Sequence, residues 1–330
     1  MRWCVLCLLW LAVAARAQAP ALERCARIED PRQRLACFDR LVPPPPTAPA
    51  APLAPLPDAE PSLLGDRWSI GISGRDSRFD LRAHKPSYLL LARYSDAPNR
   101  LPASPSKPAL AEPLDVQATE SKFQLSFKVK LADFGRIAEG LPPATLWAGY
   151  TQQSQWQVYN PRVSRPFRET NYEPEAILAF YPDREVLGWR WRLAGFGLNH
   201  QSNGRAEPLS RSWNRVIAMA GAERGDFGLI VRAWLRLPEA AAKDDNPDIT
   251  RYLGYGDVVG VYRYRDHTLS LAGRYNPASA KGALTLAWNF PLQRRVRGYL
   301  QLFSGYGESL IDYNVRQNTV GLGVSLADHL

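Results

Sequence analysis

The chain has 330 residues, of which 45% are hydrophobic, and this length allows one large domain or two modest ones. Its 41 Lys and Arg residues exceed its 32 Asp and Glu residues and give a formal net charge of +9. The basic residues are scattered and form no Lys/Arg run, so we expect no nucleic-acid partner. Beyond the first residues, no apolar stretch approaches the roughly 18 residues that a membrane-spanning helix needs, which excludes a helical membrane protein.

Residues 1–17 are predicted to be a secretory signal peptide that is removed from the mature protein. Arg2 precedes thirteen consecutive apolar residues that begin at Trp3, and a small residue follows at Ala17. The alternative is a membrane anchor, but this apolar run is too short to span a bilayer. Cleavage would also remove Arg16 and would leave 39 basic against 32 acidic residues, a net charge of +7.

Residues 18–41 are predicted to form a short helical hairpin, because apolar and charged residues recur at helical spacing in ERCARIEDPRQRLACFDRL. Cys4 and Cys7 lie in the signal peptide, so the mature chain keeps Cys25 and Cys37. One pair of cysteines in an oxidising compartment favours a disulfide. A metal site is the weaker alternative, since the two thiols have no His partners nearby.

Residues 42–65 begin VPPPPTAPAAPLAPLP and are predicted to be an extended linker, because a tract this rich in Pro and Ala cannot form a packed core. From residue 66 to residue 330 the sequence follows a different pattern. Apolar and polar residues alternate there with the period of a β-strand, interrupted by turn residues.

The segment KFQLSFKVKL at 122–131 illustrates this alternation, with Phe, Leu and Val on one parity and Gln, Ser and Lys on the other. The segments at 267–275, 282–290 and 319–326 alternate in the same way. Each run has about 9 to 11 residues, the length that a tilted strand needs to cross the hydrocarbon of a membrane. Trp and Tyr lie near many run ends, as an interfacial girdle requires.

Roughly a dozen such runs lie between Tyr88 and Leu326, and bacterial barrels close with an even number of strands. The sequence therefore predicts an all-β protein, an antiparallel transmembrane β-barrel preceded by the disulfide-stapled segment. This fold reconciles export with the hydrophobic composition, because its strands turn apolar residues outward at every second position. A soluble β-sandwich is the alternative, but its strands rarely carry so many basic residues on the second face.

The segment WRLAGFGLNHQSNG at 191–204 contains the most informative pair of polar residues. His200 and Ser202 share a parity with Phe196 and Leu198, which places both on the lipid-facing side of a strand. Polar side chains there are costly unless they function or have partners. A histidine two residues from a serine can reach its hydroxyl and activate it as a nucleophile. An incidental pair is the alternative.

The next predicted strand contributes Asn214, which shares a parity with Val216 and would also face lipid, beside His200. An amide oxygen that accepts from the imidazole N–H can fix its tautomer, as an aspartate does elsewhere. Asn in place of Asp avoids exposing a carboxylate to hydrocarbon. The alternatives are that Asn214 is a surface amide at a loop end and that Asn203-Gly204 forms a hairpin turn.

The chain resembles the bacterial outer membrane phospholipases A over most of its length after the Pro-rich tract. The strongest matches are YTQQSQWQVYN at 150–160, RPFRETNYEPE at 165–175 and NHQSNGRAEPLSRSWNR at 199–215, and DDNPDITRYLGY at 244–255 is a weaker one. The third block holds the family's active-site motif at full spacing.

The resemblance implies a twelve-stranded antiparallel barrel in the bacterial outer membrane, with an active site that faces the outer leaflet. It implies a catalytic triad of His200, Ser202 and Asn214. Gly204 matches the position whose backbone N–H donates to the oxyanion in the family.

The family also binds Ca²⁺, between two barrels that associate through their lipid-facing sides. The resemblance implies ligands at the Arg205 carbonyl and Ser210, with Ser164 lent by the second subunit, and oxygen ligands suit this hard cation. The alternatives are that both serines are ordinary loop residues and that Arg205 contacts a phosphate. Gln152 shares the lipid-facing parity of Tyr150, and the family pairs this glutamine across the dimer. Packing of Gln152 into the lumen is the alternative.

Two features depart from the family pattern. Glu207 stands where the family's best-known member has an aspartate in a second calcium site, which puts that site in doubt. The chain ends in Leu330 rather than in the aromatic residue common in such barrels.

We therefore expect a calcium-dependent phospholipase A1/A2, a serine hydrolase that removes acyl chains from glycerophospholipids and lysophospholipids through an acyl-enzyme at Ser202. Its expected partners are the phospholipid substrate, the outer membrane and a second copy of the chain in a reversible, activating homodimer. One alternative is a non-enzymatic pore or structural barrel. Another is a barrel that transfers or removes acyl groups on lipopolysaccharide.

Overall fold

The computed structural model describes residues 24–41, 62–70, 79, 81–293 and 296–327. The chain divides into two compact units, Met1–Ala59 and Glu60–Leu330. The expected signal peptide at 1–17, most of the expected linker at 42–65 and Leu330 lie outside the described residues. None of the helices in the described part of the chain is long and apolar enough to cross a membrane.

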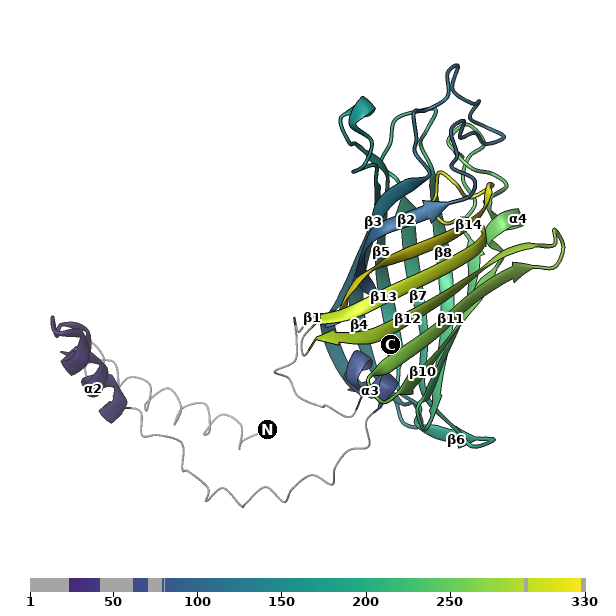
Figure 1. The fold of residues 1–330 in the computed structure, drawn as a ribbon. Helices are drawn as coiled ribbons and strands as arrows, with labels where there is room; N and C mark the ends of the chain where they lie inside the picture. Colours follow the sequence, from purple (N-terminus) through teal and green to yellow (C-terminus); the bar gives the residue numbers. More distant parts are fainter. Residues whose placement is uncertain (1–23, 42–61, 71–78, 80, 294–295, 328–330) are drawn as a thin grey trace. The chain divides into compact units, whose positions relative to one another are not determined.

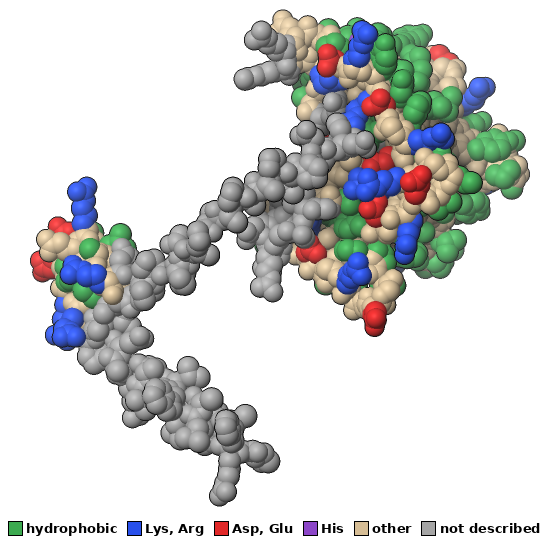
Figure 2. Space-filling model, turned by 90° about the horizontal axis from the view of Figure 1, so that it is seen from below, with side chains coloured by type: hydrophobic (Ala, Val, Ile, Leu, Met, Phe, Trp, Pro, Cys, Tyr) green, Lys and Arg blue, Asp and Glu red, His purple; other side chains and the backbone are tan. Residues whose placement is uncertain are grey.

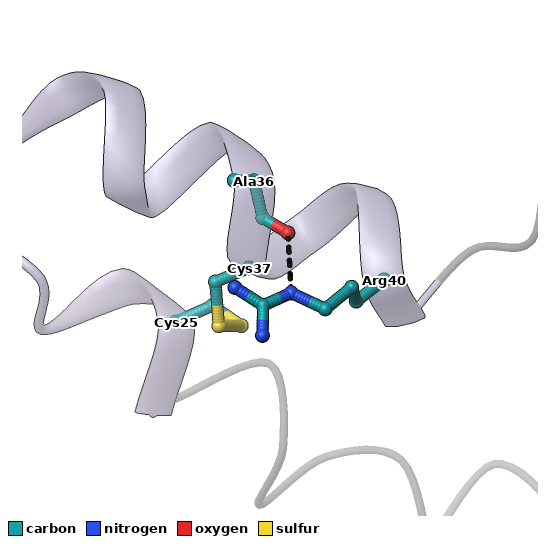
Figure 3. Close-up of a disulfide and its surroundings, with 4 residues drawn as sticks. All are labelled: Cys25, Ala36, Cys37 and Arg40. Atoms are coloured by element: carbon teal, nitrogen blue, oxygen red, sulfur yellow. Dashed lines mark hydrogen bonds between the residues drawn. A yellow bond between two sulfur atoms is a disulfide. The ribbon is translucent and has the colours of Figure 1, made fainter.

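The first unit contains a disulfide between Cys25 and Cys37, as predicted (Figure 3). Cys37 lies in α2 (Pro31–Leu41), and Cys25 lies in the helical residues 24–26. The α2 helix begins after Asp30, whose carboxylate accepts from the N–H groups of Arg32 at 2.8 Å and Gln33 at 3.0 Å. This carboxylate caps the helix, so the segment folds through local contacts and one covalent link.

The second unit is a closed antiparallel barrel of twelve long strands (Figure 1). Closure follows from the pairing of β2 with both β14 and β3, and of β3 with β4. The barrel strands are β2 (Ser87–Ser95), β3 (Thr119–Arg136), β4 (Pro143–Trp156), β5 (Phe167–Phe180), β7 (Trp189–Ser202), β8 (Ser212–Arg224), β9 (Phe227–Arg236), β10 (Gly256–Tyr264), β11 (His267–Asn276), β12 (Lys281–Gln293), β13 (Val296–Tyr306) and β14 (Arg316–Ala327).

Two short strands, β1 (Leu81–Ala83) and β6 (Arg184–Val186), pair with β3 and β7. The predicted fold class is therefore confirmed. Several strands are longer than the 9 to 11 residues expected, with 18 in β3 and 14 in β7. Backbone pairing continues past the alternating apolar stretch, which is the only part that the sequence pattern marks.

The barrel is polar inside and apolar outside, as β3 shows. Lys122, Lys128 and Lys130 are at most 4% exposed, whereas Leu125 and Phe127 on the other face are 44% and 39% exposed. The scattered basic residues of the sequence thus lie largely in the lumen, where acidic partners neutralise several of them. Glu120 accepts from Arg93 at 2.8 Å and from Arg168 at 3.0 Å.

The lower end of the barrel in Figure 1 holds the short helix α3 (Leu63–Trp68). Ser62 caps this helix, and Leu64 and Trp68 pack in a buried cluster with residues of β4, β5, β7 and β8. Residues 62–65 were expected in the linker, but Ser62 caps this helix and residues 63–65 begin it, because the Leu63 and Leu64 side chains are buried there. Figure 2 views this end, where Lys, Arg, Asp and Glu side chains gather, while hydrophobic side chains cover the side wall.

The opposite end is filled by the segment between β13 and β14. Leu310 and Tyr313 join a buried cluster with Trp213 and Trp234, next to α4 (Ile249–Leu253). Glu308 projects inward and pairs with lysine in the lumen. Described residues therefore fill the lumen at both ends, around an internal cavity of about 260 Å³.

Candidate active site

The strands β7 and β8 are adjacent and antiparallel, and their register brings the predicted residues together. His200 lies directly opposite Asn214, and Ser202 lies directly opposite Ser212. On its other side, Ser202 is opposite Tyr172 of β5. The three predicted residues therefore come from two neighbouring strands.

His200 and Ser202 lie on the outer wall of the barrel. On β7, Phe196 and Leu198 are 61% and 59% exposed, and His200 continues the same face and is also exposed. Asn199, which lies between Leu198 and His200, is buried on the lumen side. The alternation expected from the sequence therefore persists to the end of β7.

The His200 imidazole and the Asn214 amide are hydrogen-bonded, with Nδ1 2.8 Å from Oδ1. Because an amide oxygen only accepts, this pairing places the imidazole proton on Nδ1 and leaves a lone pair on Nε2. A neutral imidazole in this tautomer can accept a proton at Nε2. The pair thus has the arrangement of a general base and its orienting group.

Ser202 lies two residues beyond His200 on the same face, a Cα spacing of roughly 6.6 Å in an extended strand. Within the described residues, no hydrogen bond joins the Ser202 hydroxyl to the imidazole. Catalytic hydrogen bonds in ligand-free enzymes are often long and tighten when substrate binds. The structure thus joins His200 to Asn214 and places Ser202 beside them on the same wall.

Residues 203–211 connect β7 to β8 as a loop, rather than as the hairpin turn considered for Asn203-Gly204. The buried Asn203 side chain organises this loop. Its Oδ1 accepts from the backbone N–H groups of Arg205 at 3.3 Å and Arg211 at 2.9 Å, and its amide donates to the Leu209 carbonyl at 2.8 Å. Both arms of the loop are therefore fixed to one side chain directly after Ser202.

Gly204 has a φ of +61°, in the left-handed region that glycine adopts without steric cost. A Cβ at this position would lie 3.2 Å from the ring of Tyr172. No acceptor for the Gly204 N–H is found among the residues that the structure describes. This donor, two residues after Ser202, remains available to a bound ligand.

The same loop contains the predicted calcium ligands Arg205 and Ser210. The Ser210 hydroxyl donates to Asp245 at 2.5 Å, so its oxygen keeps lone pairs that a cation could use. Nη1 of Arg205 donates to the Arg168 carbonyl at 2.5 Å, which directs the guanidinium to the protein and weakens the phosphate alternative.

These oxygen donors suit Ca²⁺ in kind but are few. In the described ranges, no group of three or more His, Cys, Asp or Glu side chains is arranged to hold a metal ion. The Arg205 carbonyl and the Ser210 hydroxyl are therefore suitable ligands in kind, and a calcium site at this loop would require further oxygen ligands.

The Glu207 carboxylate forms an ion pair with a lysine of the same chain. The Lys107 ammonium forms an ion pair with Glu207 and lies 3.4 Å from an oxygen of Asp245. The hydrogen bond to Glu207 raises the pKa of Lys107, and the hydrogen bond to Asp245 acts in the same direction. Because one ammonium pairs with both carboxylates, a second cation at Glu207 and Asp245 would have to displace it.

Ser164 and Gln152 lie on the neighbouring strands and their loop. Ser164 is exposed and ends the 3₁₀ helix η2 (Pro161–Val163) between β4 and β5. Gln152 is half-buried in β4, directly opposite Tyr172, with its Nε2 3.4 Å from the Ser154 hydroxyl. Gln152 and Ser202 therefore flank Tyr172 in one row of the sheet.

Sequence reasoning missed two acidic residues of this region. The Asn214 amide nitrogen donates to Glu239 at 3.2 Å, and Asp245 accepts from Ser210. Glu239 reaches Asn214 only because β9 lies beside β8. The sequence around Glu239 contains no pattern that predicts this contact. For Asp245 the matched block at 244–255 was an available signal.

Comparison with known proteins gives consistent matches. The profile of a family described as Phospholipase A1 matches residues 64–326. The phospholipase A1 of Escherichia coli K12 is 41% identical over 268 residues, which are 81% of this chain and 89% of that protein. A relative from Neisseria meningitidis serogroup B is 44% identical over 256 residues, 75% of this chain and 65% of that protein.

Two solved structures have the same fold. The outer membrane phospholipase A of Escherichia coli has a TM-score of 0.67 and 40% identity, and the match covers 76% of this chain and 99% of that one. An outer membrane phospholipase of Salmonella typhi, solved as a dimer with bound calcium, has a TM-score of 0.69 and 36% identity over 82% of this chain and 99% of that one.

Proposed function

Because this chain belongs to the phospholipase A1 family and is a phospholipase of the bacterial outer membrane, we propose that Ser202, His200 and Asn214 hydrolyse phospholipid acyl esters on its outer wall. The observation that carries this proposal is the His200–Asn214 hydrogen bond of 2.8 Å, on the exposed face of β7 and β8 and beside Ser202. Polar side chains on a lipid-facing wall are costly, so a hydrogen-bonded His–Asn pair there indicates a function rather than a role in packing.

The reaction begins when Ser202 Oγ attacks the ester carbonyl carbon while His200 Nε2 takes the hydroxyl proton. Asn214 Oδ1 stays bonded to the Nδ1–H and stabilises the imidazolium that forms. The carbonyl oxygen becomes an oxyanion and accepts a hydrogen bond from the Gly204 N–H.

Collapse of this intermediate breaks the bond to the glycerol oxygen, which takes the proton from His200 and leaves as the lysophospholipid. The acyl chain remains on Ser202 as an ester. His200 then takes a proton from water, which attacks this ester and releases the fatty acid. The proton returns to Ser202 Oγ, and the starting state is restored.

The position of the site on the strand suits this substrate. His200 and Ser202 follow Phe196 and Leu198 at the very end of β7, where the apolar outer wall gives way to loop residues. Phospholipid ester bonds lie at the corresponding boundary between hydrocarbon and head groups. An acyl chain could therefore lie along the wall while its ester reaches Ser202.

We propose that Ca²⁺ would be held by the Arg205 carbonyl and Ser210 of one copy and by Ser164 of a second. When bound, the cation would polarise the charge that develops on the ester oxygen. Asp245 orients the Ser210 hydroxyl, and Lys107 competes with a cation for Glu207. The calcium-bound dimer of the Salmonella typhi relative supports this proposal.

Dimerisation would then activate the enzyme, because each calcium site is incomplete in a single copy. The outer wall around Gln152 and Tyr172 is the surface we propose for this contact. A half-buried amide in an apolar wall gains from a partner on a second copy.

The structure argues against a pore, but it does not separate a phospholipase from an enzyme that acts on lipopolysaccharide. A pore requires an open lumen, but the described lumen is filled by α3 at one end and by the segment at 308–313 at the other. Hydrolysis or transfer of acyl groups on lipopolysaccharide would use the same triad, and the choice of substrate separates it from the leading proposal.

The test is fatty-acid release from dioleoyl phosphatidylcholine by the purified chain in detergent micelles, with calcium or with a chelator. Ser202→Ala should abolish release, whereas Ser212→Ala, directly opposite on β8, should retain it. Chelation should suppress release by the wild-type chain. Unchanged release by Ser202→Ala would remove Ser202 from the mechanism, and release that is insensitive to chelation would remove the metal. Release from lipopolysaccharide but not from phosphatidylcholine would favour the second alternative.

A further inference from the structure

The Asn214 amide lies between two partners. Its Oδ1 is 2.8 Å from Nδ1 of His200, and its Nδ2 donates to the Glu239 carboxylate at 3.2 Å. Glu239 follows β9, where the Leu237 N–H still donates to the Asn214 carbonyl at 2.8 Å. The chain after β9 therefore runs beside β8 and delivers a carboxylate to the far side of the proposed orienting residue.

An asparagine can present either its oxygen or its nitrogen to a neighbour, and the two orientations have opposite consequences for His200. With the oxygen toward Nδ1, the imidazole holds its proton on Nδ1 and Nε2 is free to act as a base. With the nitrogen toward Nδ1, the ring would have to accept there, its proton would move to Nε2, and the base would be lost.

Glu239 selects between these orientations. An ionised carboxylate only accepts hydrogen bonds, so it favours the amide nitrogen on its side and repels the amide oxygen. Within the described part of the chain, no Lys or Arg forms an ion pair with the half-buried Glu239, and its carboxylate accepts from the Asn214 amide nitrogen. The carboxylate also polarises the amide, which strengthens the hydrogen bond to an imidazolium.

We propose that Glu239 is a positioning residue, which fixes the orientation of Asn214 and through it the tautomer of His200. This inference rests on the proposed function and adds a fourth member to its chain of contacts. It also explains how an outer-wall site can use a carboxylate, because the neutral amide keeps the charge one group away from the imidazole and the acyl chain.

The first test is a double-mutant cycle on phosphatidylcholine hydrolysis in micelles. Glu239→Ala should lower kcat about tenfold and change KM less than twofold, and Glu239→Gln should fall between it and the wild-type chain. Asp at position 214 has two equivalent oxygens and no orientation to select. In the Asn214→Asp background, Glu239→Ala should therefore leave kcat unchanged or raise it, because it also removes like-charge repulsion.

Glu185→Ala is the matched control, since this exposed carboxylate lies in β6 at the other end of the barrel. It should leave kcat within twofold. Equal losses from Glu239→Ala in both backgrounds would indicate a purely structural role for Glu239 and would overturn the inference, as would a change in kcat below twofold in the wild-type background. Hydrolysis that survives Ser202→Ala would instead refute the proposed function, so the two failures are distinguishable.

A second measurement does not depend on turnover. The ¹⁵N resonances of the His200 ring, assigned with a His200→Gln variant, report which nitrogen carries the proton. The wild-type chain should show protonated Nδ1, and Glu239→Ala should show a mixture that includes protonated Nε2. Identical tautomers in both chains would overturn the inference even if the Asn214→Asp variants were inactive.

Discussion

Tyr172 and Ser202 lie directly opposite each other on β5 and β7, and the Tyr172 ring also lies 3.2 Å from the place where a Cβ at Gly204 would stand. The ring thus contacts the backbone that carries the proposed oxyanion donor, immediately after the proposed nucleophile. Gly204 is constrained twice at this point, by its φ of +61° and by the ring beside it.

Gly204→Ala should therefore impair catalysis more than it impairs stability. The left-handed backbone should cost about 1 kcal/mol in free energy of unfolding, and the contact with Tyr172 should displace the N–H from the oxyanion. We expect kcat to fall by about 10². Gly225→Ala is the matched control, because Gly225 has a φ of +54° but no atom within 4 Å of its Cβ position. A similar loss of kcat in both variants would contradict the proposed role of Gly204.

Asn214→Ala should lower kcat by about 10² or more, because it removes the acceptor that holds the His200 proton on Nδ1. KM should change little, since the amide contacts the imidazole and not the substrate. Steady-state hydrolysis of phosphatidylcholine in micelles measures both constants. A variant with wild-type kcat would exclude Asn214 from the mechanism.

Glu120→Ala should destabilise the barrel by about 3 kcal/mol, because two buried guanidinium groups each lose one carboxylate and keep only Glu308 and Asp312, respectively. Glu120 is 1% exposed and accepts from Arg93 and Arg168. Denaturant unfolding in detergent checks this value. Asp133→Ala, at an exposed position in the same strand, should change the free energy of unfolding by less than about 0.5 kcal/mol. Equal effects of the two substitutions would contradict the account of the lumen.

Trp68→Ala should open the end of the barrel that α3 fills. Trp68 is 3% exposed, and the Lys128 ammonium lies 3.3 Å from its ring centroid. The loss of this side chain should cost about 3–5 kcal/mol in stability. In planar bilayers the wild-type chain should conduct little, and the variant should conduct more. Leu187→Ala, at a position 91% exposed, is the control and should change neither property. High conductance of the wild-type chain would support the pore alternative.

Much of the fold could be predicted because each strand of a transmembrane barrel alternates between lipid-facing apolar residues and lumen-facing polar residues. The alternation in β3, with lysines inside and apolar residues outside, needs no knowledge of distant contacts. The helix α3 and the segment at 308–313 escaped prediction for the opposite reason. Their apolar residues are buried only because a barrel surrounds them, and a short apolar run carries no sign of that enclosure.

Some residues of the candidate site could likewise be predicted from the strand pattern, and others could not. Parity along β7 and β8 placed His200, Ser202 and Asn214 on one face, and the register then joined two of them. The roles of Asn203 and Glu239 depend on loop geometry and on a third strand, and a single sequence specifies neither. Lys107 illustrates the limit most clearly, because 100 residues separate it from its ion-pair partner Glu207.

The proposed mechanism requires Ser202 as the nucleophile and His200 as the base that activates it. Mass spectrometry of the chain after treatment with a fluorophosphonate, which reacts covalently with activated serines, tests this requirement most directly. We expect one adduct, located at Ser202, in the wild-type chain and its loss in His200→Ala. An adduct at another serine, or equal labelling of Ser202 without the imidazole, would contradict this mechanism.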